Sequence, residues 1–114
     1  MASEPKISER RRGERVLIRI PVKVYGIGKD GKHVNEDAEA VVISRKGALI
    51  LAVTPLKPGS TLEVRHGLSQ ETERFRVVWV SERAKEGRFD IGIELMETRE
   101  EFWGIRFPPA DRNS

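Results

Sequence analysis

The sequence contains no cysteine, and no apolar run approaches the roughly 20 residues that span a bilayer. Without cysteine, disulfides and thiolate metal sites are excluded, and nothing calls for an oxidising compartment. The first residues lack the apolar segment of a secretion signal, so we expect a soluble, cytoplasmic protein with no membrane insertion. A length of 114 residues is enough for one domain with a single hydrophobic core.

Motifs that carry catalytic or metal chemistry are also missing. The sequence has no nucleophile–base motif, no phosphate-binding P-loop and no spaced set of metal ligands. Its two histidines, His33 and His66, lie in expected turns far apart in the chain, which is typical of surface side chains. We therefore expect no enzymatic activity, no metal site and no bound cofactor.

Positive charge is concentrated near the start of the sequence. The net charge is +3, from 21 basic and 18 acidic residues, and residues 1–23 carry seven basic and three acidic side chains. The rest of the chain is therefore about neutral. This distribution favours a local anion-binding site over the broad basic face that a nucleic-acid binder needs.

Six short segments are expected to be strands, and the first and the last of them alternate apolar and polar residues, as strands with one buried face do. Turn signals separate them, and the Asp30-Gly31 pair in particular indicates a hairpin. The expected strands are Val16–Val24, Ala38–Ile43, Ala48–Val53, Thr61–Arg65, Arg74–Val80 and Phe89–Leu95. Such a series predicts a barrel or a sandwich. In the fifth strand Trp79 shares a face with Phe75 and Val77, so we expect it in the core rather than exposed as a stacking platform.

The end of the sequence changes character. Thr98 and Glu101 have the spacing of a helix capping box, which predicts a short helix carrying Phe102, Trp103 and Ile105. This helix should plug or cover one open end of the strand assembly. Burial of Trp103 is the favoured interpretation, and a docking patch for a partner protein is the alternative.

Four arginines, Arg10, Arg11, Arg12 and Arg15, lie immediately before the first strand. Arginine is always charged, presents a planar fork of donors and stacks on flat rings, so it suits ligands that combine phosphates with purines. Arg11 and Arg15, in an extended segment, would lie about 13 Å apart and face the same way. A short basic run is also typical of a solvated tail, or of nonspecific contact with nucleic acid or anionic lipid.

Two motifs in order resemble those of the PilZ domain, the bacterial receptor module for cyclic di-GMP. The segment Arg11–Arg15 matches the family's RxxxR before the first strand, and Val42–Gly47 matches [D/N]xSxxG at Ser44 and Gly47. The similarity covers residues 10–107. It implies an all-β fold, a six-stranded antiparallel PilZ-type β-barrel with a short C-terminal helix. The flanking residues, 1–9 and 108–114, would be a flexible N-terminal tail and a C-terminal tail.

The resemblance also implies a function. It predicts a bacterial second-messenger receptor that binds cyclic di-GMP, changes conformation and regulates an unidentified effector protein in motility, exopolysaccharide or virulence machinery. The expected ligand-binding residues are Arg10, Arg11, Arg12, Arg15, Ser44, Arg45 and Gly47. An arginine fork can meet O6 and N7 of guanine. The Ser44 hydroxyl both donates and accepts, and Gly47 permits a positive φ and a close approach of ligand or backbone.

Val42 departs from the family pattern, because an acidic or amide residue is expected there. Valine cannot accept hydrogen bonds from guanine, and each lost charge-assisted bond costs about 1.5–3 kcal/mol. A PilZ-like adaptor that no longer binds the nucleotide and acts by protein–protein contact is therefore the alternative. A third hypothesis, a nonspecific nucleic-acid binder, predicts a steep salt dependence.

Overall fold

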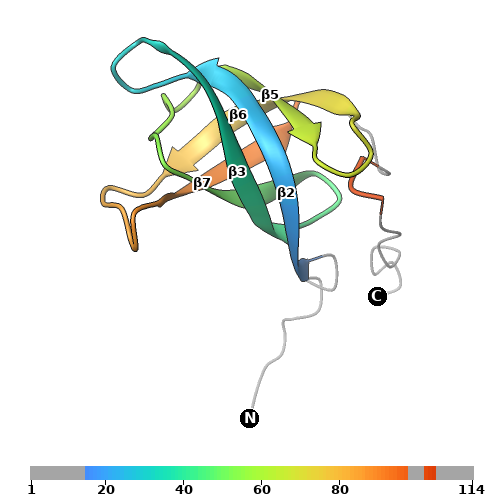
Figure 1. The fold of residues 1–114 in the computed structure, drawn as a ribbon. Helices are drawn as coiled ribbons and strands as arrows, with labels where there is room; N and C mark the ends of the chain where they lie inside the picture. Colours follow the sequence, from blue (N-terminus) through green and yellow to red (C-terminus); the bar gives the residue numbers. More distant parts are fainter. Residues whose placement is uncertain (1–14, 98–101, 105–114) are drawn as a thin grey trace, which may run out of the picture.

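The computed structural model describes residues 15–97 and 102–104, which form a closed six-stranded barrel (Figure 1). The strands are β2 (Val16–Ile27), β3 (His33–Ile43), β4 (Gly47–Ala52), β5 (Thr61–His66), β6 (Thr72–Val80) and β7 (Phe89–Leu95). Around the barrel they follow the order β2-β3-β4-β7-β6-β5, and all neighbours are antiparallel. The predicted six-stranded antiparallel barrel is confirmed, and the sandwich is wrong.

Strands β2 and β3 form a longer hairpin than the sequence pattern predicts. Their pairing continues out to Ile27 opposite His33, so the turn is confined to residues 28–32. The Asp30-Gly31 hairpin signal is confirmed, and Gly31 has the positive φ, +85°, that glycine tolerates best. The outer part of this hairpin is rich in polar residues, and for that reason apolar alternation does not reveal it.

The barrel interior is filled by apolar side chains from alternate positions of the strands. In β2, Ile20, Val22 and Val24 are buried, whereas Pro21 is exposed and Lys23 is only half-buried. This is the period of two that a strand with one buried face requires. The other strands bury alternate residues in the same way. Their outward-facing residues are both polar and apolar, and a binding site could lie on this outer face of the barrel.

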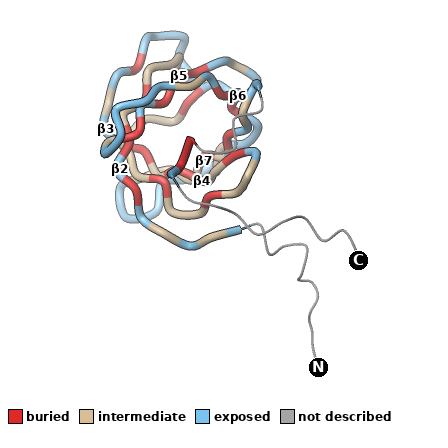
Figure 2. Tube along the Cα trace, turned by 90° about the vertical axis from the view of Figure 1, so that its right-hand side faces the viewer, coloured by how far each residue is buried: buried red, intermediate tan, exposed pale blue. Residues whose placement is uncertain are grey.

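Four aromatic rings close one end of the barrel, and we call this cluster the aromatic plug: His66, Phe75, Phe102 and Trp103. Phe102 contacts Trp103 and Phe75 edge to face, with ring centroids 4.9 and 5.7 Å apart. Figure 2, which looks through the barrel, shows the short buried segment 102–103 inside the ring of strands. The predicted burial of Trp103 is confirmed. Residues 102–104 form a turn, and residues 98–101 lie outside the described part, so the helix stays a prediction.

The prediction that His66 is a surface side chain is wrong. β5 extends to His66, whose ring turns into the aromatic plug and is 5% exposed. Its Nδ1 accepts hydrogen bonds from the backbone N–H groups of Leu68 at 3.1 Å and Ser69 at 3.4 Å. The ring proton therefore sits on Nε2, which donates to the carbonyl of Trp103 at 3.3 Å. His66 thus links the β5–β6 turn to the plug.

Candidate functional site

An open groove of about 750 Å³ lies on the outer face of the barrel, where β3, β4, β7 and β6 are neighbours. Its volume is within the range of roughly 300–1,000 Å³ that is typical of small-ligand sites. The lining comes from the residue before β2, from the β3–β4 turn and from the four strands. It comprises Arg15, Val42, Ile43, Ser44, Lys46, Gly47, Ala48, Leu49, Val78, Trp79, Gly92, Ile93 and Glu94.

The groove brings together three of the residues that the two motifs single out. Arg15, Ser44 and Gly47 all line it, although Arg15 is far from the other two in sequence. Lys46, rather than Arg45, supplies the cation of the β3–β4 turn; Arg45 is half-buried and interacts with other residues. The remaining predicted residues, 10–12, lie outside the described part of the chain, so their roles stay predictions.

The Ser44 hydroxyl is engaged in the β3–β4 turn. Its Oγ accepts a hydrogen bond from the Gly47 N–H at 3.1 Å and donates to the Gly47 carbonyl at 3.4 Å. The Ser44 N–H donates to the same carbonyl at 2.9 Å. Serine side chains commonly satisfy turn backbone in this way. Ser44 therefore shapes the wall of the groove, and one lone pair of its oxygen remains for a ligand.

Gly47 is required by close packing between β4 and β7. A Cβ at this position would lie 2.2 Å from the carbonyl oxygen of Ile93, which is a backbone atom that cannot step aside. Just before it, the Lys46 carbonyl accepts the Leu95 N–H at 2.7 Å. The expected close approach of backbone is confirmed. Gly47 does not use the positive φ that glycine permits, because the positive-φ glycines of the described residues are Gly31, Gly59, Gly87 and Gly104.

The prediction that Trp79 lies in the core is wrong. Trp79 is 50% exposed and lines the groove, and its neighbour Val78 is 51% exposed. The pairing of β6 with β7 shifts between Val77 and Trp79, and this bulge turns Trp79 to the outer face. Its ring covers Gly92, where a Cβ would be 3.7 Å from the ring carbon Cε3. The unbroken apolar run 77–80 is the available sequence signal, because it interrupts the alternation.

The groove combines apolar walls with both signs of charge. Val42, Leu49 and Trp79 contribute apolar surface, Arg15 and Lys46 are cationic, and Glu94 of β7 is anionic. Glu94 lies opposite Gly47 in the strand register. Sequence reasoning missed Glu94, because nothing in a regular β7 alternation distinguishes it from other exposed acids. Only strand pairing brings it beside the β3–β4 turn.

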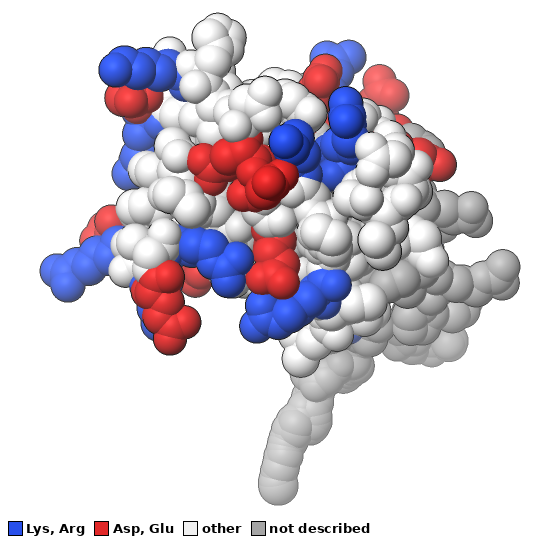
Figure 3. Space-filling model, in the orientation of Figure 1, with Lys and Arg blue, Asp and Glu red and all other residues white. Residues whose placement is uncertain are grey.

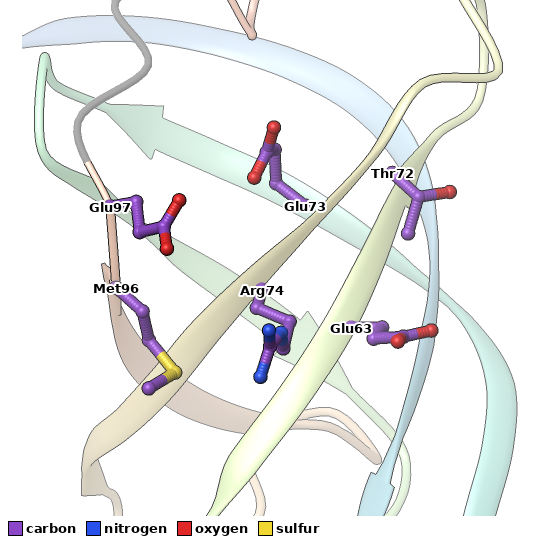
Figure 4. Close-up of a pocket in the computed structure, with 6 residues that line it drawn as sticks. All are labelled: Glu63, Thr72, Glu73, Arg74, Met96 and Glu97. Carbon is purple, nitrogen blue, oxygen red and sulfur yellow. The ribbon is translucent and has the colours of Figure 1, made fainter.

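A second, smaller pocket of about 320 Å³ lies near the end of β7 (Figure 4). Figure 4 shows Glu73 and Arg74 pointing to opposite sides, as successive residues of β6 do, with the carboxylates of Glu63 and Glu97 on either side of the strand. Among residues 15–97 and 102–104, no group of three or more potential ligands is arranged to hold a metal ion. Because acidic and basic side chains both line this pocket, its charge indicates no particular class of ligand.

The barrel face seen in Figure 3 carries interleaved basic and acidic side chains. Glu39 accepts from Arg19 at 2.8 Å and from Arg88 at 3.2 Å, and Lys23 pairs with Asp37 at 3.5 Å. Exposed pairs of this kind stabilise a fold by at most about 1 kcal/mol. These pairs neutralise charge locally, and in Figure 3 the basic side chains of the described residues are interrupted by acidic ones rather than forming the continuous basic surface that nucleic-acid binding uses.

Comparison of the sequence with protein-family models and with curated proteins gives no match. Within the described residues, no helix is long and apolar enough to cross a membrane.

Proposed function

We propose that this chain is a cyclic di-GMP receptor of the PilZ type. The observation that carries the proposal is the groove, in which Arg15, the last arginine of the RxxxR segment, meets the Ser44–Gly47 turn. In the PilZ domains that these motifs resemble, the same two elements hold the nucleotide. Their meeting in one groove is what a single ligand contacted by both motifs would need.

The chemistry of the groove suits this ligand. Cyclic di-GMP carries two phosphates and two guanines, and Arg15 and Lys46 supply positive charge for the phosphates. The exposed ring of Trp79 offers a flat apolar surface on which a purine can stack, and base–aromatic stacking contributes about 1–3 kcal/mol per base. An apolar wall with a few polar groups is the usual composition of a small-molecule site.

Binding would act on the segment that precedes β2. Arg15 is exposed at the start of this strand, and the other arginines of the motif come directly before it. A nucleotide in the groove gives the segment a fixed anionic partner, so the bound state differs from the free state in the surface presented beside β2. An effector protein that reads this surface would transmit the signal, in motility, exopolysaccharide or virulence machinery.

Isothermal titration of the full chain with cyclic di-GMP, with GTP as the control nucleotide, tests the proposal. We expect saturable binding of the cyclic dinucleotide alone. Arg15→Ala should weaken it about tenfold or more, because one charge-assisted contact of at least about 1.5 kcal/mol is lost. Arg83→Ala is the matched control, since Arg83 is exposed in the turn after β6 and lies outside the groove.

Equal affinities of Arg15→Ala and Arg83→Ala would contradict the proposal. Full binding by the double variant Arg11→Ala/Arg15→Ala would do the same for the whole RxxxR segment.

A nucleotide-free adaptor is the second candidate, and the apolar groove wall favours it. Val42 stands where the family pattern has a hydrogen-bonding residue, and Leu49, Val78 and Trp79 extend the apolar surface. Exposed apolar patches of this kind mark protein interaction sites. The adaptor predicts no binding heat and no shift in melting temperature with cyclic di-GMP, together with loss of partner binding in Trp79→Ser.

A further inference from the structure

Glu94 is the one acidic side chain among the described residues that line the groove. It is exposed on the outer face of β7, between Gly47 of β4 and Arg76 of β6 in the strand register. Within residues 15–97 and 102–104, its carboxylate has neither a hydrogen-bond partner nor an ion-pair partner. The carboxylate therefore retains its full capacity to accept hydrogen bonds from a ligand.

A free carboxylate is unfavourable in a site for a ligand with two phosphates unless it contacts another part of that ligand. Like charges repel, and the apolar walls of the groove reduce the screening by water. A carboxylate can only accept hydrogen bonds, so the part of the ligand that it contacts must present donors, and a pair of donors engages both of its oxygens. Guanine has such a pair on its Watson–Crick edge, the N1–H and the exocyclic N2 amine. Adenine has an acceptor at N1 instead, which would face the carboxylate oxygen with a lone pair.

We infer that Glu94 makes the groove select guanine over adenine, an inference that rests on the proposed function. The two oxygens of Glu94 accept the N1–H and the N2 amine of one guanine. The hydrogen-bonding group that the family pattern has at position 42 of β3 is thus supplied from β7. Val42 then serves as part of the apolar wall.

The geometry of β7 suits this role. Gly92 and Glu94 lie on the same face, two residues apart, which is about 7 Å along a strand. The Trp79 ring covers Gly92. A purine stacked on the exposed side of that ring therefore has one edge within reach of the Glu94 side chain. Stacking on Trp79 binds any purine, whereas hydrogen bonds from the Watson–Crick edge to Glu94 distinguish guanine from adenine.

The test is isothermal titration of the wild type and of Glu94→Gln with cyclic di-GMP and with cyclic di-AMP. Glutamine keeps the shape of the side chain, but its NH₂ group faces one of the guanine donors. We expect cyclic di-GMP to bind about tenfold or more weakly, as the loss of one charge-assisted bond implies. Cyclic di-AMP should bind unchanged or more tightly, because a charge that repels its phosphates is gone. Glu63→Gln is the control, since Glu63 is exposed on β5 outside the groove.

The sign of the change separates the outcomes. If Glu94→Gln tightens both nucleotides by the same factor, Glu94 is only a repelling charge at the rim, and the inference is overturned while the receptor stands. If Glu94→Gln binds both nucleotides with unchanged affinity, the inference is likewise overturned while the receptor stands. If the wild type binds neither nucleotide, the proposed function fails and the inference fails with it. An unchanged melting temperature of Glu94→Gln, expected for an exposed side chain, shows that the variant is folded.

Discussion

The two tryptophans of the chain lie in opposite environments. Trp103 is 2% exposed in the aromatic plug, where it contacts Phe75 and Phe102. Trp79 is 50% exposed on the outer face of the barrel and lines the groove. The same residue type therefore closes the fold at one place and lines the candidate binding groove at another. Exposure, rather than the presence of an aromatic residue, distinguishes a structural aromatic from a candidate functional one.

The two regions also differ in how their polar groups are used. In the plug, both ring nitrogens of His66 are committed to backbone partners, and the Trp103 Nε1 is buried there without a hydrogen-bond partner among the described residues. In the groove, Arg15 and Glu94 line an open space, and only the Ser44 hydroxyl is engaged in the turn. Saturated polar groups stabilise a fold, whereas available ones can bind a ligand. We therefore expect substitutions in the plug to change stability, and substitutions of the Arg15 and Glu94 side chains in the groove to change binding.

The largest expected difference in stability is between substitutions of the two tryptophans. Trp103→Ala should lower the free energy of unfolding by about 3–5 kcal/mol, because it removes a fully buried aromatic side chain. Trp79→Ala should lower it by no more than about 1 kcal/mol, since half of the side chain is already in water. Urea unfolding followed by circular dichroism measures both. If Trp103→Ala is unfolded in buffer, Trp103→Phe provides the graded comparison. Equal losses for the two positions would contradict the distinction.

A pair of glycines sharpens the comparison within the groove. Gly47→Ala should cost about 1–3 kcal/mol of stability, because the new Cβ would collide with the Ile93 carbonyl. Gly92→Ala should change stability by less than about 1 kcal/mol, since its Cβ would meet Val78 and Trp79 at ordinary contact distances of 3.5–3.7 Å. Thermal melts of the two variants check this order, and the reverse order would show that β4 and β7 are not so closely packed.

The smallest effect is expected at the β3–β4 turn. Ser44→Ala should reduce the free energy of unfolding by about 1 kcal/mol, the typical value of a hydrogen bond, because the Gly47 N–H loses its side-chain partner. Affinity for cyclic di-GMP should fall less than in Arg15→Ala. A loss of binding as large as that of Arg15→Ala, with stability unchanged, would instead mean that the hydroxyl contacts the ligand directly.

Much of the barrel is predictable from the sequence, because burial of one strand face leaves a local pattern. The alternation predicts β7 with its observed bounds, and the spacing of Ile20, Val22 and Val24 identifies the buried face of β2. The outer part of the β2–β3 hairpin escapes prediction, since polar residues of a projecting hairpin carry no such pattern. His66 escapes it for a related reason: its burial depends on Phe102 and Trp103, which are distant in sequence.

The candidate site is predictable only in part. The resemblance to the two PilZ motifs singles out Arg15, Ser44 and Gly47, and the groove contains all three. Trp79 and Glu94 are not identified in this way. A one-residue bulge decides which face Trp79 occupies, and the pairing of β7 with β4 decides what lies beside Glu94. Neither strand carries this information alone.

The sequence by itself determined the class of the fold, the concentration of positive charge before β2 and the identity of the β3–β4 turn. These depend on neighbouring residues, and local patterns record them. Only the tertiary structure decided which tryptophan is buried, why Gly47 must be glycine and which carboxylate faces the groove. The physical reason is strand register, because a shift of one residue turns a side chain from the core to the surface, and register is settled between strands rather than within them.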